Sequence, residues 1–319
     1  MRIFNILSKG LDGNLGEKQR VEEEKDLILL SLVYFRFLTK EQIWKLLDNN
    51  RSLESTARRV RSLENLNLVF HQGGSAKGAL KTKYFYYITK TGYNYISNKL
   101  DYTNFPKFVP VSKQGGALRE HRIAVMDVVA SLVKNIKKVN FKHPITIKNL
   151  LLDHKMDGEN RETTDYFFHQ NKKITITPDF ILVLQIGTIG HYLCIGEVDR
   201  GTESILNLTP KKTSDSALDQ KFQRLDAYIK SRAIYKKLGN EYNFLNEDPT
   251  VLFITTTERR IQSIKRRLAY KNELKTGSKE NEFDNLYLYT TLENSNHNPF
   301  RKVWVNRNIN NNYLLDLID

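Results

Sequence analysis

The sequence predicts an α/β (α+β) protein with two domains, an N-terminal winged helix-turn-helix followed by a mixed-sheet domain flanked by helices. Three observations predict this. Three helix-length segments precede a short β-hairpin within residues 21–88, a stretch containing Pro and Gly follows, and β-branched runs then alternate with amphipathic segments. The chain has 319 residues, of which 40% are hydrophobic, and this is enough for two separate cores.

The N-terminal domain is expected over residues 21–104, after a flexible stretch at 1–20. Thr39 is placed to cap a helix. The expected elements are helices at about 21–37, 40–48 and 53–66, a strand at 68–70, a Gly-rich turn at 73–78 and a strand at 84–88. Three helices and then a β-hairpin are the element order of a winged helix-turn-helix.

A linker is expected over residues 105–117, where two prolines and the pair Gly115-Gly116 interrupt regular structure. The second domain would then occupy residues 118–319. Its expected elements are a helix at 118–137, strands at 139–149 and 163–169, a hairpin at 173–199, a helix at 215–238, a strand at 250–255, a helix at 257–274, and closing strands near 285–291 and 303–306.

The predicted hairpin carries the most informative residues of the chain. Two β-branched runs, 173–186 and 190–199, flank a turn that contains glycine. A hairpin centred between the two runs places Asp179 opposite Glu197, and directly opposed residues lie ~5 Å apart at Cβ. Asp199 shares the face of Glu197, because strand side chains repeat every two residues. Three carboxylates on one patch need a cation, a proton or a basic partner to be stable.

These residues carry a family resemblance. Pro178-Asp179, followed after a hairpin by Glu197-Val198-Asp199, resembles the PD-(D/E)XK nuclease pattern, in which acidic groups at adjacent strand ends hold a divalent metal. With Phe180 and the residues up to Glu203 included, the string is similar to the replication-relaxation family of plasmids and mobile elements, which is related to the MobC-type mobilisation relaxases. The resemblance implies a winged helix joined to a restriction-endonuclease-like domain.

The resemblance also implies a metal site. Asp179, Glu197 and Asp199 are the expected ligands, and their hard oxygens suit Mg²⁺ or Mn²⁺. The third motif position usually holds Lys, and this chain has Asp199 there. Lys221, from the following helix, is a candidate to take the role of that Lys in catalysis. Arg200 is the alternative for neutralising the phosphate, although its side chain is expected to start on the opposite sheet face. Asp199 is then a third ligand or a base.

Two accessory candidates, Glu120 and His121, lie on the helix expected at 118–137. In one interpretation this helix supplies an extra carboxylate or imidazole to the site. In the other, His121 lies at the edge of the apolar stripe and satisfies a local hydrogen bond.

The charge distribution indicates nucleic acid as a partner. The formal net charge is +14, and residues 51–100 contain nine Lys or Arg against two Glu, so half of the excess lies on the third helix and the wing. The expected phosphate contacts, in this region and on the helix at 257–274, are Arg58, Arg59, Arg61, Lys81, Lys83, Arg266 and Arg267. The alternative is a solvated basic face on a protein-binding winged helix.

Several classes of protein are disfavoured. The single cysteine, Cys194, excludes an internal disulfide and a Cys-based zinc site. No apolar run approaches the ~18 residues of a membrane-spanning helix, and the first residues do not resemble a signal peptide, so we expect a cytoplasmic protein with no membrane partner. There is no phosphate-binding Gly-Lys-Ser/Thr loop. The sixteen tyrosines leave a tyrosine nucleophile open.

Two functions remain. The first is a relaxase-like protein that binds the double-stranded origin DNA of a plasmid or mobile element and nicks it with a divalent metal during mobilisation or replication. The second is a catalytically inactive nuclease-fold protein that binds DNA as a replication accessory factor or transcription regulator, and the missing motif Lys favours it. In both cases other mobilisation or replication proteins, or a second copy of the chain as a homodimer, are candidate partners.

Overall fold

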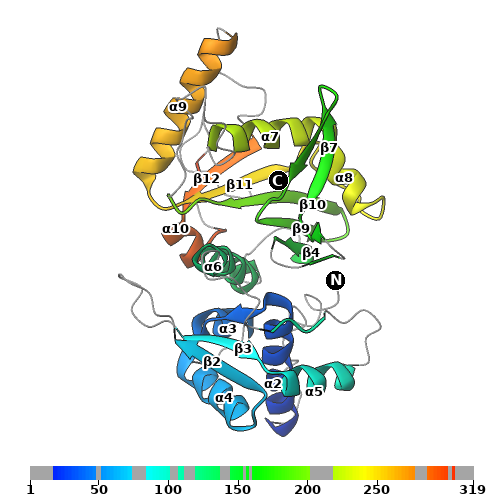
Figure 1. Cartoon of the computed structure of the whole chain (residues 1–319), viewed down its shortest axis with the longest axis vertical. Coiled ribbons are helices and arrows are strands. Elements are labelled where there is room, and N and C mark those ends of the chain that lie inside the picture. The colour runs from blue at the N-terminus through cyan, green and yellow to red at the C-terminus, as the bar shows by residue number, and fades with distance from the viewer. Residues whose placement is uncertain are drawn as a thin grey trace. The chain divides into compact units, whose positions relative to one another are not determined.

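The chain forms a mixed α/β protein, as the sequence predicts. Its contacts divide it into two compact units, Met1–Lys134 and Asn135–Asp319. The computed structural model describes residues 17–47, 52–73, 84–100, 107–110, 119–136, 144–153, 156–157, 160–201, 218–276, 286–300 and 304–305 (Figure 1).

The first unit has the predicted order of three helices followed by a hairpin. Its elements are α2 (Glu17–Phe35), β1 (Phe37–Leu38), α3 (Lys40–Leu47), α4 (Leu53–Asn65), β2 (Val69–Gly73), β3 (Tyr84–Ile88) and α5 (Lys90–Leu100). The strands form an antiparallel sheet in the order β1-β3-β2. The short β1 and the helix α5 are additions to the predicted elements. Most of the Gly-rich turn expected at 73–78 lies outside the described residues.

Side-chain caps determine where α3 and α4 begin. Thr39 Oγ1 accepts the backbone N–H of Gln42 at 3.2 Å, and Gln42 Oε1 accepts the backbone N–H of Thr39 at 2.9 Å. This reciprocal pair satisfies two N–H groups that have no partner within the helix, and it confirms the predicted cap. The Ser52 hydroxyl accepts the N–H of Ser55 at 3.2 Å at the start of α4.

Helix α6 (Arg119–Ile136) packs on α3 within the first unit. Gln42 Nε2 donates to the carbonyl of Ile123 at 3.2 Å and to Asp127 Oδ1 at 2.8 Å. The contacts divide the chain near the end of α6, after Lys134, whereas the second domain is expected to begin at residue 118. These hydrogen bonds join residues 81 and 85 positions apart, so the local sequence pattern carries no sign of them.

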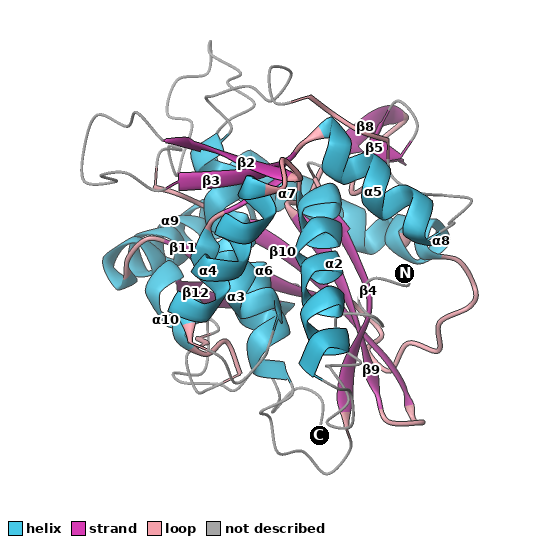
Figure 2. Cartoon of the chain, turned by 90° about the horizontal axis from the view of Figure 1, so that it is seen from below, coloured by secondary structure: helices cyan, strands magenta, loops and turns pink. Residues whose placement is uncertain are grey.

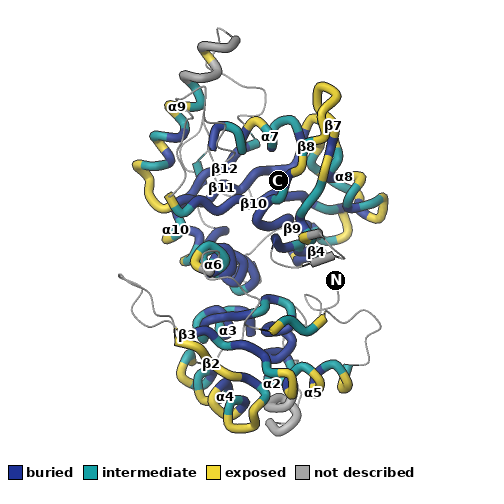
Figure 3. The backbone as a smooth tube through the Cα atoms, viewed as in Figure 1, coloured by how far each residue is buried: buried dark blue, intermediate teal, exposed yellow. Residues whose placement is uncertain are grey.

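The second unit is built on a five-stranded mixed sheet of order β12-β11-β10-β9-β4. Its strands are β4 (Ile145–Leu152), β9 (Phe180–Ile186), β10 (Gly190–Val198), β11 (Thr250–Thr255) and β12 (Tyr287–Thr291). The pairs β4–β9 and β9–β10 are antiparallel, whereas β10–β11 and β11–β12 are parallel. Strands β4 and β9 run side by side over their length (Figure 2). Strand β11 is buried throughout, and β9 and β10 are buried except at Gln185 and His191, which are half-buried (Figure 3).

Helices and two small hairpins complete the second unit. These elements are β5 (Met156–Asp157) with β6 (Asn160–Arg161), β7 (Asp165–His169) with β8 (Lys172–Ile176), α7 (Leu218–Ser231), α8 (Ala233–Leu238), α9 (Glu258–Thr276) and α10 (Leu292–His297). The run expected as one strand at 173–186 is divided into β8 and β9, because Pro178 has no N–H to donate and interrupts the ladder. Of the closing strand expected at 303–306, only residues 304–305 are described, and Val305 forms an antiparallel bridge with Tyr289.

The register of β9 with β10 is the one that the sequence predicts. Gly190 lies opposite Ile186 and Gly196 lies opposite Phe180, so the next step of the ladder sets Asp179 against Glu197. The Phe180 ring covers Gly196 so closely that a Cβ on Gly196 would lie 2.0 Å from it. A glycine at this position therefore allows the Phe180 ring to pack across β10 on the sheet face opposite to the two carboxylates.

We expect Gly196→Ala to destabilise the second unit by about 1–3 kcal/mol, because the added methyl overpacks the site against the Phe180 ring. The measurement is urea unfolding by tryptophan fluorescence in a Trp44→Phe background, where Trp304 is the single tryptophan and reports on the second unit.

Gly73→Ala is the matched control, because its added Cβ meets nothing closer than 3.7 Å. Phe180→Leu added to Gly196→Ala should recover part of the loss through a favourable coupling. Equal midpoints for Gly196→Ala and the parent would contradict the packing argument.

Candidate active site

Three neighbouring strands bring a row of carboxylates to the face of the sheet that α7 covers. Asp179 directly precedes β9, Glu197 is the penultimate residue of β10, and the two share a face with Ile181 and Ile195 of the core beneath α7. Asp179 is 6% exposed and Glu197 is fully buried. A carboxylate buried to this extent is stable in its charged form only if hydrogen bonds or an opposite charge offset the loss of hydration.

Backbone hydrogen bonds on both sides hold Asp179. The amide of Val198 donates to Asp179 Oδ2 at 2.7 Å, and the carbonyl of Asp179 accepts the amide of Asp153 at 3.1 Å. Asp153 directly follows β4 and is 6% exposed, so it adds a third carboxylate to the row. Its carboxylate lies 3.6 Å from Arg161 Nη1. Asp153 is not among the predicted site residues, because it falls in the polar segment between the strands expected at 139–149 and 163–169.

Lys221 contributes the basic group of the site. It lies in the first turn of α7, and its Nζ is 2.5 Å from Glu197 Oε2. The Lys221 side chain is 28% exposed, whereas that of Glu197 is 1% exposed, so the ammonium connects the buried carboxylate with solvent. Lys221 therefore lies where the sequence analysis expects the substitute for the motif Lys.

Asp199 has a different environment. Its Oδ2 accepts the Thr255 hydroxyl at 2.7 Å, its Oδ1 accepts the amide of Gly201 at 2.9 Å, and the Arg260 guanidinium binds both oxygens. These donors fasten the end of β10 to β11 and α9. Asp199 is thus the partner of Arg260, whereas Asp179 accepts the amide of Val198 and Glu197 pairs with Lys221.

Asp179 and Glu197 suit a hard divalent cation. Mg²⁺ keeps several water ligands and is usually held by one or two carboxylates together with substrate phosphates, and Mn²⁺ also prefers oxygen ligands. Among the residues that the structure describes, no group of three or more His, Cys, Asp or Glu side chains is arranged to hold a metal ion. A cation held by these two carboxylates would therefore need water and phosphate oxygens to complete its coordination.

The predicted DNA-binding residues fall into three groups. Arg58 and Arg61 on α4 are exposed, and so are Arg266 and Arg267 on α9. Arg59 is 16% exposed and pairs with Glu24 of α2, which is fully buried. Lys81 and Lys83 lie outside the described residues. Arg59 therefore acts in the packing of the first unit.

The accessory candidates lie in the first unit. Glu120 is exposed and His121 is half-buried, and both are in the first turn of α6. The carboxylates of the central hairpin lie in the second unit.

Three buried tyrosines of the second unit are poor nucleophiles. The Tyr228 hydroxyl donates to Asp165 Oδ2 at 2.7 Å, and the Tyr287 hydroxyl donates to Asp226 Oδ1 at 2.6 Å. Burial, together with the neighbouring carboxylate, raises the pKa of Tyr228, of Tyr287 and of Tyr289 above the ordinary value. The phenolate form is therefore unfavourable at these three positions.

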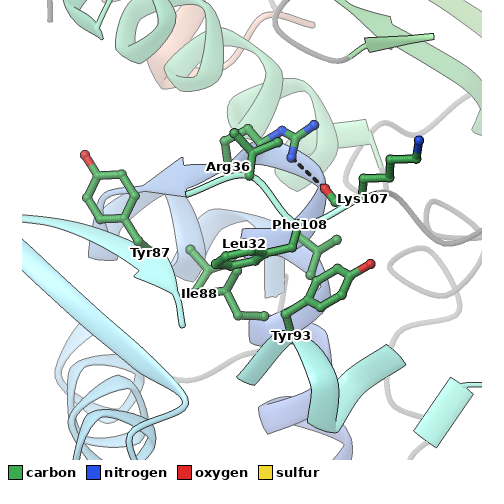
Figure 4. A pocket seen from close by; sticks show the side chains of 9 residues that line it. Leu32, Arg36, Tyr87, Ile88, Tyr93, Lys107 and Phe108 are labelled. Atoms are coloured by element: carbon green, nitrogen blue, oxygen red, sulfur yellow. Dashed lines mark hydrogen bonds between the residues drawn. The ribbon is translucent and has the colours of Figure 1, made fainter. Parts of the chain in front are cut away.

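A small hollow in the first unit has a structural role (Figure 4). Arg36 Nη1 donates to the carbonyl of Lys107 at 3.0 Å, and the rings of Phe108 and Tyr93 lie 5.5 Å apart. Burial, with a smaller contribution from Arg122, lowers the pKa of the Arg36 guanidinium. These two contacts thus attach residues 107–110 to α2 and α5.

Comparison with known families agrees with the resemblance of the sequence. The family model described as replication-relaxation matches residues 29–237, well over half of the chain. The chain belongs to the replication-relaxation family. The span that matches this family includes Asp179, Glu197 and Lys221 and ends before β11. No curated protein and no solved structure shows a significant match to the chain. None of the described helices is long and apolar enough to cross a membrane.

Lys221→Met is expected to destabilise the second unit by about 3 kcal/mol, because it leaves Glu197 charged and buried without its ammonium partner. Glu197→Gln combined with Lys221→Met should unfold near the parent midpoint, since the double variant removes both charges of the pair and leaves neither unpartnered. Urea unfolding followed by tryptophan fluorescence in the Trp44→Phe background measures the midpoints of both variants.

Lys236→Met provides the comparison, because Lys236 is an exposed lysine of α8 and its loss should leave the midpoint unchanged. A double variant that is no more stable than Lys221→Met alone would refute the charge-pair explanation.

Proposed function

We propose that this member of the replication-relaxation family binds duplex DNA at the origin of a plasmid or mobile element and nicks one strand at Asp179 and Glu197 with Mg²⁺ or Mn²⁺. Membership in the family indicates a role in plasmid replication or mobilisation. The observation that carries the proposal is the buried Glu197 beside Asp179, with the Lys221 ammonium 2.5 Å away. Acidic groups at adjacent strand ends, together with a nearby lysine, form a set suited to metal-assisted phosphodiester cleavage.

The first unit supports the DNA-binding part of the proposal. Its three helices and hairpin have the order of a winged helix, in which the third helix is the element that contacts DNA. That helix is α4, and its exposed side carries Arg58 and Arg61. Both are placed to neutralise phosphate and to reach base edges.

The residues of the second unit support the chemical part. When bound, a divalent cation polarises the phosphate and lowers the pKa of an attacking water. Asp179 and Glu197 would hold it, with the position of Asp179 fixed by the amide of Val198. Lys221 has enough exposure to leave Glu197 and contact a phosphate oxygen. Arg260 and Asp199 keep the end of β10 in place.

An inactive DNA-binding protein is the second candidate, and one observation favours it. Lys221 already neutralises Glu197, so Asp179 alone would contribute the net negative charge of a two-carboxylate site. A cation would then bind weakly, and the unit would serve to bind DNA only. Metal-dependent nicking separates the two candidates.

Supercoiled plasmid that carries the cognate origin should become open-circular with the parent protein and Mg²⁺ or Mn²⁺. Asp179→Asn and Glu197→Gln should lower the nicking rate about 100-fold or more, because each removes a carboxylate that would hold the cation against the phosphate. Gel electrophoresis over time gives the rate, and fluorescence anisotropy checks that DNA binding is retained.

Glu258→Gln is the control, since Glu258 is exposed in the first turn of α9. Equal nicking by Glu197→Gln and the parent would refute the site assignment. DNA binding without nicking by any variant would favour the second candidate.

The double variant Arg58→Ala/Arg61→Ala should lower the slope of log affinity against log salt by about 1.8, since each phosphate contact contributes about 0.9. Arg266→Ala/Arg267→Ala should weaken binding without changing the preference for cognate over scrambled duplex. Competition binding over a salt series measures both quantities.

Arg59→Ala is a useful contrast, because its loss should lower the stability of the first unit through Glu24 and leave the salt slope unchanged. Should the α9 variant lose cognate preference while the α4 variant keeps it, recognition would belong to the second unit.

A further inference from the structure

The β7–β8 hairpin has an outer face of exposed rings. Tyr166 is 55% exposed and Phe168 is 72% exposed, and both alternate with Phe167, which is buried in the core of the second unit. Figure 3 shows the outer part of this hairpin as exposed. Large aromatic side chains on the surface often mark a binding site.

The exposure does not come from a loosely attached hairpin. Gln170 and Asn171 form a two-residue turn, both with positive φ (48° and 60°), which matches the right-handed twist of paired strands. At the base, Asp165 accepts the Tyr228 hydroxyl at 2.7 Å, and Lys237 Nζ donates to the carbonyl of Thr164 at 3.0 Å. The hairpin therefore presents its rings from a fixed support.

Basic groups surround these rings. Lys173 lies opposite Phe168 in the ladder, and its Nζ is 4.0 Å from the centroid of the Tyr166 ring. Lys172 lies opposite His169 at the tip. Asp165 is the one acidic residue of the hairpin, and it is engaged at the base. Rings beside ammonium groups suit a ligand that has flat aromatic groups and negative charge.

The hairpin is continuous with the candidate active site. β8 ends at Ile176, and Asp179 follows three residues later. Four residues of extended chain, from Thr175 to Asp179, span at most ~14 Å. A strand of DNA held at Asp179 can thus also reach Tyr166, which pairs with Thr175.

We propose that Tyr166, Phe168 and Lys173 bind single-stranded DNA by stacking on unpaired bases, with the lysine contacting a phosphate. The two rings lie ~7 Å apart along β7, so each can contact a different base. Duplex DNA offers no free base faces, so this surface selects unpaired DNA. The inference rests on the proposed function only for the conclusion that this single strand is the one to be nicked.

The test is fluorescence anisotropy of the full chain with a labelled oligo(dT) of roughly 20 nucleotides and with a duplex of the same length, in EDTA. Phe168→Ala and Tyr166→Ala should each weaken binding of the single strand about tenfold. Neither should change duplex binding. Ile189→Ala is the matched control, because Ile189 is 46% exposed in the turn between β9 and β10.

Two further variants separate stacking from apolar contact. Phe168→Trp should bind the single strand at least as well as the parent, whereas Phe168→Leu should behave like Phe168→Ala. Unchanged binding by Phe168→Ala and Tyr166→Ala, or parent-like binding by Phe168→Leu, would overturn the proposal.

Unfolding midpoints should stay at the parent value, since the altered side chains are exposed. Because no divalent metal is present, the result is independent of nicking. If Glu197→Gln still nicks DNA, the site assignment fails but the single-strand binding result stands. If the ring variants bind the single strand as well as the parent, this proposal fails but the nicking result stands.

Discussion

A fully buried carboxylate constrains the whole of the second unit. Glu197 lies in the central strand of the sheet, between antiparallel β9 and parallel β11. A charge at that depth is unfavourable by several kcal/mol unless it is paired. Lys221 supplies the partner from the first turn of α7, and this requires α7 to cross that face of the sheet. The apolar residues of α7, such as Phe222, then belong to the same core as Ile195 of that face. The position of α7 on the sheet thus determines both the packing of the core and the pairing of Glu197 in the candidate site.

Glu24, Glu197 and Asp199 are each at most 3% exposed, and the basic partners of these three carboxylates differ in kind. Two of the pairs use arginine, Glu24–Arg59 in the first unit and Asp199–Arg260 in the second. An arginine is permanently charged and holds a carboxylate through a planar fork, which suits a fixed attachment. Glu197 instead has a lysine, whose flexible stem can move its charge to another anion. The Glu197–Lys221 pair is therefore suited to chemistry, whereas the two arginine pairs are suited to packing.

The sequence predicts what repeats locally and misses what depends on distant pairing. The period of two and the turn position were sufficient for the register that opposes Asp179 and Glu197, and capping chemistry was sufficient for Thr39. Asp153 was missed because its partner in the ladder lies 26 positions away, beyond an apparent loop. Arg59 was assigned to the surface because composition does not show which arginine of a basic helix faces a buried acid. The inward position of Arg260 is predictable from the sequence, because Arg260 lies four residues before the buried Ile264 and so shares its side of α9.

The match to the family covers the residues proposed for chemistry, but not all of their support. It ends at residue 237, before β11 and α9. Asp199 lies within the match, yet two of its side-chain partners, Thr255 and Arg260, lie beyond it. A chain cut after residue 237 would leave one edge of β10 without its parallel neighbour and Asp199 without its charge partner. In this protein the matched region is therefore not a self-sufficient fold, and the parallel half of the sheet holds the hairpin carboxylates in their positions.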